Sequence, residues 1–163
     1  MKLFKGIPAS AGVAIGKAFL LRREEFAEPK PSRAQDVEAE VARFNEAIDK
    51  TRNELSKIQA KVTEEIGKDH ADIFSAHISV LDDPLLNSGI IDEVRKTGLN
   101  VDHVFWQAVL RLEKMLSSID IEYFKDKHAD VRDVGLRVMK NLAGPGAGEN
   151  LAELKEEAIV FAY

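Results

Sequence analysis

The strongest structural constraint in this sequence is an apolar seam between residues 37 and 62. Its members are spaced alternately by four and three residues, and Thr51 is the single polar one. An α-helix places such positions on one face, so the pattern predicts a long helix that packs against another helix. We interpret the seam as packing within one chain, in a helical hairpin; a dimer interface is the alternative. The seam consists of Val37, Val41, Phe44, Ile48, Thr51, Leu55, Ile58 and Val62.

The ends of this helix carry recognisable signals. Ser32 is predicted to cap its start, with Gln35 three residues later at the capping-box position. Gly67 is expected to end or bend it. The first helix is therefore predicted to begin just after the proline-containing linker at 28–31.

Four shorter helices are expected after the first, each with apolar residues at helical spacing. Asp83 and Pro84 are predicted to start the third, and Asn100 to cap the fourth. Ile73 in the second helix and Met115 in the fourth are expected to point inward. The four helices are predicted over about 69–82, 83–98, 101–116 and 120–144.

Glycine-punctuated, β-rich segments flank the helices. Residues 3–22 predict two short strands, at 13–15 and 18–21, and residues 158–163 predict another. The expected fold class is mainly α, with an antiparallel helical-hairpin domain inserted between partial β elements. We predict a strand segment at 1–30, a helical domain at 31–144, and a linker with a returning strand at 145–163. Because the chain stops inside an apolar run, we expect it to be part of a longer protein.

Composition narrows the classes of function. The absence of cysteine excludes a disulfide framework and a thiolate metal site. The net charge of −5, from 28 acidic and 23 basic residues, disfavours nucleic acid as the main partner and suits a basic protein. No apolar run approaches the ~20 residues of a membrane span, and no signal peptide is evident, so we expect no membrane association and a cytoplasmic location.

His77 is the most informative single residue. It lies on the apolar stripe of the second predicted helix, where a histidine is most often half-buried and makes one hydrogen bond. The functional interpretation is an interface residue that bonds a partner. His70 lies two turns away, too far for the two imidazoles to share a zinc ion. Four aspartates bracket this helix and are either simply solvated or an acidic rim around an apolar patch: Asp69, Asp72, Asp82 and Asp83.

A second charged cluster lies in the fifth predicted helix. Asp126, His128 and Asp130 do not share a helix face and are expected to be solvated. Arg132 either joins a local ion network with the neighbouring aspartates or projects toward a partner. The sequence contains no phosphate-binding loop and no nucleophile with an evident base beside it. We therefore predict a recognition surface, with no catalytic, cofactor-binding or metal-binding residues in this chain.

Three blocks of sequence resemble the phosphoenolpyruvate-protein phosphotransferases, that is, enzyme I of the bacterial sugar phosphotransferase system. They occur in the family's order and cover the whole chain. The blocks are Gly6–Ala18 (GIPASAGVAIGKA), Ile73–Pro84 (IFSAHISVLDDP), and Ala129–Gly135 (ADVRDVG) with the following Arg137–Leu142.

This resemblance implies a helical domain that docks the phosphocarrier protein HPr, inserted in an α/β phosphohistidine domain. The family moves a phosphoryl group from phosphoenolpyruvate to its own histidine and then to HPr, for sugar uptake. By resemblance, that histidine and the Mg²⁺ site lie beyond this chain. The longer parent is then a transferase, whereas this chain alone is expected to be inactive.

The resemblance also implies a docking face. Ser79 stands where the family often has a larger apolar residue, and Pro84 and Leu85 stand where acids are common. HPr carries basic residues beside its active histidine, so an acidic rim would favour encounter. The implied partner-binding residues are Lys68, Asp69, Ser75, His77, Ser79, Val80, Pro84, Leu85, Leu86, Leu116, Phe124, Lys127 and Arg132.

Two alternatives stay open at this point. One is a structural helical module that self-associates through the seam of 37–62. The other is an enzyme I paralogue used in nitrogen signalling, which shares the same blocks. The docking interpretation predicts a monomeric chain and a homodimeric parent.

Overall fold

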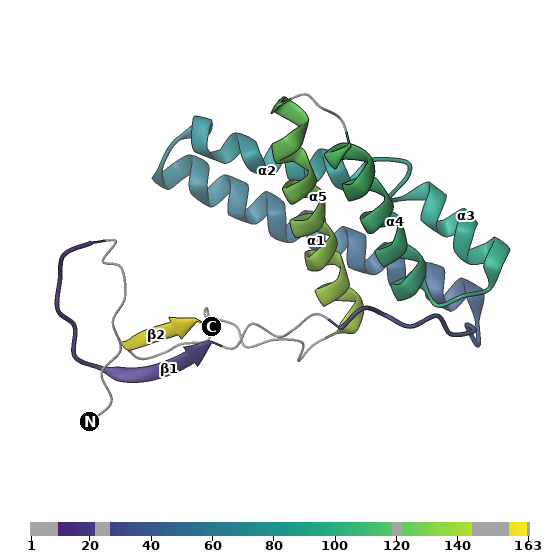
Figure 1. The fold of residues 1–163 in the computed structure, drawn as a ribbon, viewed down its shortest axis with the longest axis horizontal. Helices are drawn as coiled ribbons and strands as arrows, with labels where there is room; N and C mark the ends of the chain where they lie inside the picture. The colour runs from purple at the N-terminus through teal and green to yellow at the C-terminus, as the bar shows by residue number, and fades with distance from the viewer. Residues whose placement is uncertain (1–9, 22–26, 119–121, 145–156, 163) are drawn as a thin grey trace. The chain divides into compact units, whose positions relative to one another are not determined.

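The computed structural model describes residues 10–21, 27–118, 122–144 and 157–162, and these form five helices and two strands (Figure 1). The chain divides into two compact units, one of Met1–Glu25 with Gly148–Tyr163 and the other of Phe26–Ala147. The elements are β1 (Lys17–Leu21), α1 (Val37–Glu65), α2 (Lys68–Leu81), α3 (Ser88–Thr97), α4 (Val101–Ser117), α5 (Glu122–Ala143) and β2 (Ala158–Ala162).

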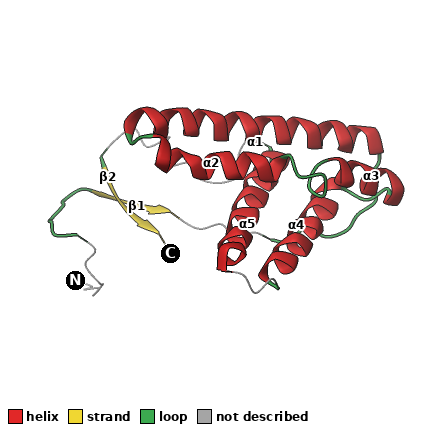
Figure 2. Ribbon diagram, turned by 90° about the horizontal axis from the view of Figure 1, so that it is seen from above, coloured by secondary structure: helices red, strands yellow, loops and turns green. Residues whose placement is uncertain are grey.

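The helical unit is built from two hairpins. Helix α2 runs back along α1, and α5 runs beside α4, as both views show (Figures 1 and 2). Helix α5 also packs on α1, and the short α3 packs on α4. The predicted fold class, mainly α with antiparallel hairpins, is confirmed.

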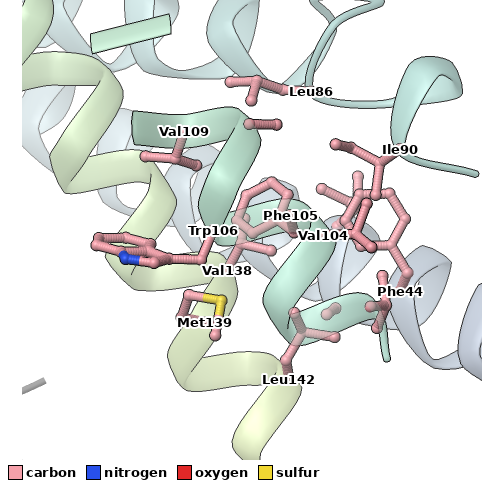
Figure 3. Packing of buried hydrophobic residues seen from close by; sticks show 14 of the residues in the cluster. Phe44, Leu86, Ile90, Val104, Phe105, Trp106, Val109, Val138, Met139 and Leu142 are labelled. Carbon is pink, nitrogen blue, oxygen red and sulfur yellow. The ribbon is translucent and has the colours of Figure 1, made fainter. Parts of the chain in front are cut away.

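The seam of α1 is buried inside the chain. Val41, Phe44, Ile48 and Leu55 are all in the core, where Phe44 meets Phe105 of α4 with ring centroids 5.5 Å apart (Figure 3). Burial of such side chains is the main favourable term in folding. The interpretation of the seam as packing within one chain is therefore confirmed for its central part.

Thr51, the polar member of the seam, is fully buried and fully bonded. Its hydroxyl donates to the Ala47 carbonyl (2.7 Å) and accepts from the Asn141 side chain of α5 (2.9 Å). Asn141 also donates to Glu54 at 3.3 Å. A buried polar group without partners costs free energy, so this pair favours one register of α5 on α1.

The predicted cap of α1 at Ser32 is wrong. Asp36 caps the helix, because its carboxylate accepts from the backbone N–H groups of Glu38 (2.9 Å) and Ala39 (3.1 Å). Ser32 instead lies alongside Asn100, whose side chain accepts from the Ser32 N–H at 2.8 Å. The regular helix starts at Val37, so Asp36 and not Ser32 is in the N-cap position.

The same contact changes the start of α4. Asn100 is its N-cap residue, as predicted, but the Asn100 side chain makes no capping bond. The first free N–H of α4, on Val101, donates to the Glu40 carboxylate of α1 at 2.7 Å. The carboxylate of Glu40, from another helix, thus replaces the Asn100 side chain as the capping acceptor.

Helix α3 begins later than predicted. Asp83 accepts from the Leu85 N–H (2.8 Å), and residues 84–87 form turns, so that regular helix starts only at Ser88. Its predicted end is confirmed: Gly98 takes a left-handed conformation (φ 64°) and its N–H donates to the Val94 carbonyl. Glycine has no Cβ to oppose that conformation.

Arg43 joins three helices. Its guanidinium donates to Asp102 of α4, to Glu40 of α1 (2.9 Å), and to the Leu142 carbonyl near the end of α5 (3.1 Å). The hydrogen bonds that Arg43 donates to Asp102, and then those to Glu40, raise the pKa of Arg43 above its ordinary value against the opposing effect of burial. The cation therefore stays charged wherever the protein is folded.

Two exposed ion pairs hold α3 in place. Arg95 donates two bonds of 2.8 Å to Glu38 of α1, and Glu93 accepts one of 2.8 Å from Arg111 of α4. The bonds from Arg95 lower the pKa of Glu38. A carboxyl with a lowered pKa stabilises the folded state above its unfolded pKa, and that contribution is lost as the pH falls through the folded value.

The small β unit contains two paired strands. β1 and β2 run parallel, with Lys17 opposite Ala158 and Leu21 opposite Ala162. The strands predicted near 18–21 and 158–163 are confirmed. The strand predicted at 13–15 is wrong: Val13 and Ile15 are 96% and 100% exposed, and this segment has no ladder partner among the described residues.

None of the described helices has the combination of length and apolar composition required to cross a membrane.

Gly135 explains how closely α4 and α5 approach. A Cβ built on it would lie 2.8 Å and 3.0 Å from the two methyl groups of Val109 on α4. Val109 and Val134 are fully buried at this contact. The glycine is thus required by packing, although it lies inside a helix where alanine is intrinsically better.

We expect Gly135→Ala to lower the free energy of unfolding by about 1–3 kcal/mol, because the added methyl group overpacks the α4–α5 contact. Chemical denaturation measures this change. Combining it with Val109→Ala should lose less than the sum of the two single changes, since the second variant makes room for the methyl group. Stabilisation by Gly135→Ala, as helix propensity alone predicts, would contradict the close-contact explanation.

Candidate protein docking face

Helix α2 carries six of the thirteen implied docking residues, and the structure separates them onto two flanks. Ser75 lies toward α1, where its hydroxyl accepts from Gln59 at 2.7 Å. His77 lies toward α5. Side chains two positions apart on a helix are rotated by about 200° around its axis. Ser75 and His77 therefore face opposite ways. Lys68, Asp69 and Ser79 are exposed, and Val80 is half-buried against the core.

His77 is buried between α2 and α5. It is 8% exposed, its Nε2 lies 3.4 Å from a carboxylate oxygen of Asp130, and its ring meets Phe74 edge-on at 6.1 Å. Asp130 was expected to be a solvated charge; the structure instead half-buries it against this imidazole. Neither residue alone signals the pair, because the two are 53 positions apart.

The turn after α2 contributes an exposed apolar side chain. Leu85 is 57% exposed, and Pro84 is also at the surface. Leu86, in contrast, is 2% exposed and belongs to the core (Figure 3). Within the implied face, the buried Leu86 therefore anchors the turn in the core, while the side chain of Leu85 is exposed to solvent.

Leu85 borders a surface pocket of about 230 Å³. Met115 of α4, predicted to point inward, is 49% exposed and lines the same pocket. The prediction fails because α4 ends beside this opening, where the core no longer covers its stripe. The lining residues are Leu85, Ala108, Arg111, Leu112 and Met115.

Arg132 of α5 is held on α4. Its guanidinium lies over the buried Trp106 ring, 5.8 Å from the centroid, and donates to Glu113 at 3.1 Å. The sequence suggested Asp130 and Asp133 as its partners, but the described geometry pairs it across to the neighbouring helix. Such a cation over an indole face is favourable and fixes the side chain at the surface of the α4–α5 hairpin.

The remaining implied residues are on α4 and α5. Leu116 is half-buried against the core. Phe124 and Lys127 lie in α5, but their side chains are outside the described residues.

Sequence reasoning missed a further apolar residue on the α5 flank of α2. Ile73, predicted to point inward, is 50% exposed. It precedes His77 by one helical turn and so lies on the same flank. The periodicity that marks Ile73 as apolar does not show that the hairpin end leaves it uncovered.

The acidic residues around α2 are only partly available. Asp69 and Asp72 are exposed, whereas Asp82 pairs with Arg52 of α1 at 2.8 Å and Asp83 accepts from the turn backbone. Among the described residues no group of three His, Cys, Asp or Glu side chains is placed to hold a metal ion. What the described surface offers is an apolar patch with an acidic rim, the usual anatomy of a protein interface.

Comparison with known proteins gives the family. The family model described as PEP-utilising enzyme, N-terminal, matches residues 5–127. The chain belongs to this family. The family membership predicted from the three sequence blocks is confirmed.

Curated relatives of this PEP-utilising family member are named phosphoenolpyruvate-protein phosphotransferase. The protein from Priestia megaterium is 39% identical over 161 residues, covering 99% of this chain and 28% of the relative. That from Bacillus subtilis (strain 168) is 40% identical over 162 residues, with the same coverage. That from Staphylococcus aureus (strain MRSA252) is 41% identical over 143 residues, covering 88% of this chain and 25% of the relative. The chain thus spans about a quarter of their length.

Solved structures agree with the fold. The NMR solution structure of an Enzyme I protein (nEIt) superposes with a TM-score of 0.82 at 35% identity, covering 98% of this chain and 64% of that one. The N-terminal domain of Enzyme 1 - Nitrogen gives 0.72 at 21% identity, covering 88% and 60%. The second likeness shows a shared fold.

Arg132→Gln should change the fluorescence of Trp106, the single tryptophan of the chain, because the cation lies over its ring. We also expect a loss of about 0.5–1 kcal/mol in unfolding free energy. Arg111→Gln is the matched control, since Arg111 lies on the same helix as Trp106 but pairs with Glu93. Equal spectra for the two variants would contradict the contact between Arg132 and Trp106.

Proposed function

We propose that this chain is the N-terminal part of a phosphoenolpyruvate-protein phosphotransferase, and that its helical unit docks the phosphocarrier protein HPr. The observation that carries the proposal is the exposed apolar side chains of Ile73, which begins the Ile73–Pro84 block, and of Leu85, which follows it. Relatives of that name match nearly the whole chain. The face has the composition of an interface, and among its described residues no three His, Cys, Asp or Glu side chains are grouped to hold a metal ion.

In this proposal the chain recognises its partner and the rest of the parent performs the chemistry. The longer protein is the transferase: it takes the phosphoryl group from phosphoenolpyruvate and passes it to HPr for sugar uptake in the cytoplasm. The phosphorylated histidine and the Mg²⁺ site would lie in the parts of the relatives that this chain does not span. We expect this chain alone to be inactive and monomeric, and the parent to be a homodimer.

Charge supports the choice of partner. The chain carries a net charge of −5, and Asp69 and Asp72 are exposed beside the apolar patch. A basic surface on HPr would be attracted to this rim. Such attraction speeds the association of the two proteins and orients them, and it changes the final affinity less. Binding should accordingly weaken as the ionic strength rises.

Self-association through the α1 seam has less support. The central seam residues are already buried against the chain's own helices, so a second copy could reach them only after unfolding. An enzyme I paralogue in nitrogen signalling shares the fold of the 21% identical structure and would bind its own carrier through the same face.

The first test is an NMR titration of this chain with unphosphorylated HPr from the same organism. Shift changes should be confined to residues around 69–86 and 116–132. Shifts elsewhere, or none at millimolar HPr, would contradict the proposal; a concentration-dependent dimer in sedimentation velocity would favour self-association.

A pair of substitutions at Leu85 tests the electrostatic part. Leu85→Lys should weaken HPr binding about tenfold, because it removes an apolar contact and places a cation against a basic partner. Leu85→Glu introduces the opposite charge at the same exposed site. It should bind HPr about tenfold more tightly than Leu85→Lys does. Equal affinities for the two variants would remove Leu85 from the docking face.

A further inference from the structure

One ring nitrogen of His77 is bonded within the helical unit and the other is buried. Nε2 lies 3.4 Å from the Asp130 carboxylate, while Nδ1 is buried and has no hydrogen-bond partner among the described residues. The side chain is only 10% exposed. An imidazole held in this way has no ring nitrogen to offer to a docking partner, which argues against the direct bond that the sequence suggested for His77.

The surroundings select one tautomer of the neutral ring. A carboxylate oxygen only accepts, so the proton must be on Nε2 for the hydrogen bond to Asp130 to form. The proton is then absent from Nδ1, and no buried N–H is left without an acceptor, which would be the more costly arrangement. The edge-on contact with Phe74 holds the ring plane in the same orientation.

This pair lies where the two halves of the candidate face meet. Asp69, Ile73 and Val80 come from α2, whereas Phe124, Lys127 and Arg132 come from α5. A partner that contacts both helices binds best when their spacing is set in advance, because less ordering is then needed on binding. Among the described contacts, the His77–Asp130 bond joins α2 to α5 within this face.

We propose that Asp130 is a positioning residue of the docking face: it accepts from Nε2–H of His77, fixes that tautomer, and sets the spacing of α2 and α5. The inference rests on the proposed docking function and adds that His77 acts through this bond and not by touching HPr.

The test compares two substitutions of Asp130. Asp130→Asn keeps an oxygen acceptor in the same place, while Asp130→Leu has a similar shape and no acceptor. Nitrogen-15 NMR of the imidazole should report the Nε2–H tautomer in the wild-type chain and in Asp130→Asn, and a mixture of tautomers in Asp130→Leu. The HPr dissociation constant should rise for Asp130→Leu by about threefold or more, the low end of coupling between residues in contact, and change little for Asp130→Asn.

Substitutions of His77 complete a double-mutant cycle. His77→Gln can place an amide N–H near the position of Nε2 and should keep binding, whereas His77→Leu should weaken it. The double variant His77→Leu with Asp130→Leu should be no weaker than either leucine variant alone, because the two changes remove one bond. Thermal unfolding of each variant separates a loss of docking from a loss of folding.

The outcomes are distinct. A wild-type Nδ1–H tautomer, an unchanged tautomer in Asp130→Leu, or wild-type affinity in a folded Asp130→Leu would overturn the inference. If the wild-type chain does not bind HPr at all, the proposed function is wrong, and the docking part of the inference is wrong as well. The nitrogen-15 spectra then still decide whether Asp130 fixes His77.

Discussion

The burial of the α1 seam by the other helices is the interaction on which this structure depends. Phe44 and Leu55 are removed from water only because α4 and α5 cross α1, and α2 folds back along it. The polar bond between Thr51 and Asn141 then favours one register among those that hydrophobic contact alone would allow. Arg43 ties α1 to α4 and to the Leu142 carbonyl of α5, one residue beyond Asn141. The shape of the candidate docking face depends on this core, because the helices that carry the face pack on it.

Much of the fold was predictable, because it follows from local periodicity and from residues with strong backbone preferences. The seam of α1, the end of α3 at Gly98 and the strand at 158–163 are of this kind. The departures at the starts of α1 and α4 both involve contacts between residues far apart in the chain. Ser32 bonds to Asn100 and leaves the cap to Asp36, while Glu40 satisfies the first free N–H of α4. No single-sequence rule anticipates acceptors that arrive from another helix.

The candidate site was predictable to a different extent. Resemblance placed it on α2, α4 and α5, and the comparisons confirm the family. What each side chain does there depends on burial that the sequence does not encode locally. Leu86 and His77 turn inward, Leu85 and Met115 turn outward, and Asp130 becomes the partner of an imidazole. Exposure at the ends of hairpins is decided by where neighbouring helices stop, so periodicity overestimates the number of covered positions.

The pairing of β1 with β2 has a consequence for how this family can diversify. Adjacent parallel strands always require a long crossover connection. Here the connection, residues 22–157, has grown into a helical unit with a core of its own. Among the described residues the ladder pairs Lys17–Leu21 with Ala158–Ala162. Substitutions on the exposed surface of the helices therefore change no residue of the described ladder, so the sequence of that surface can vary while the strand pairing is kept.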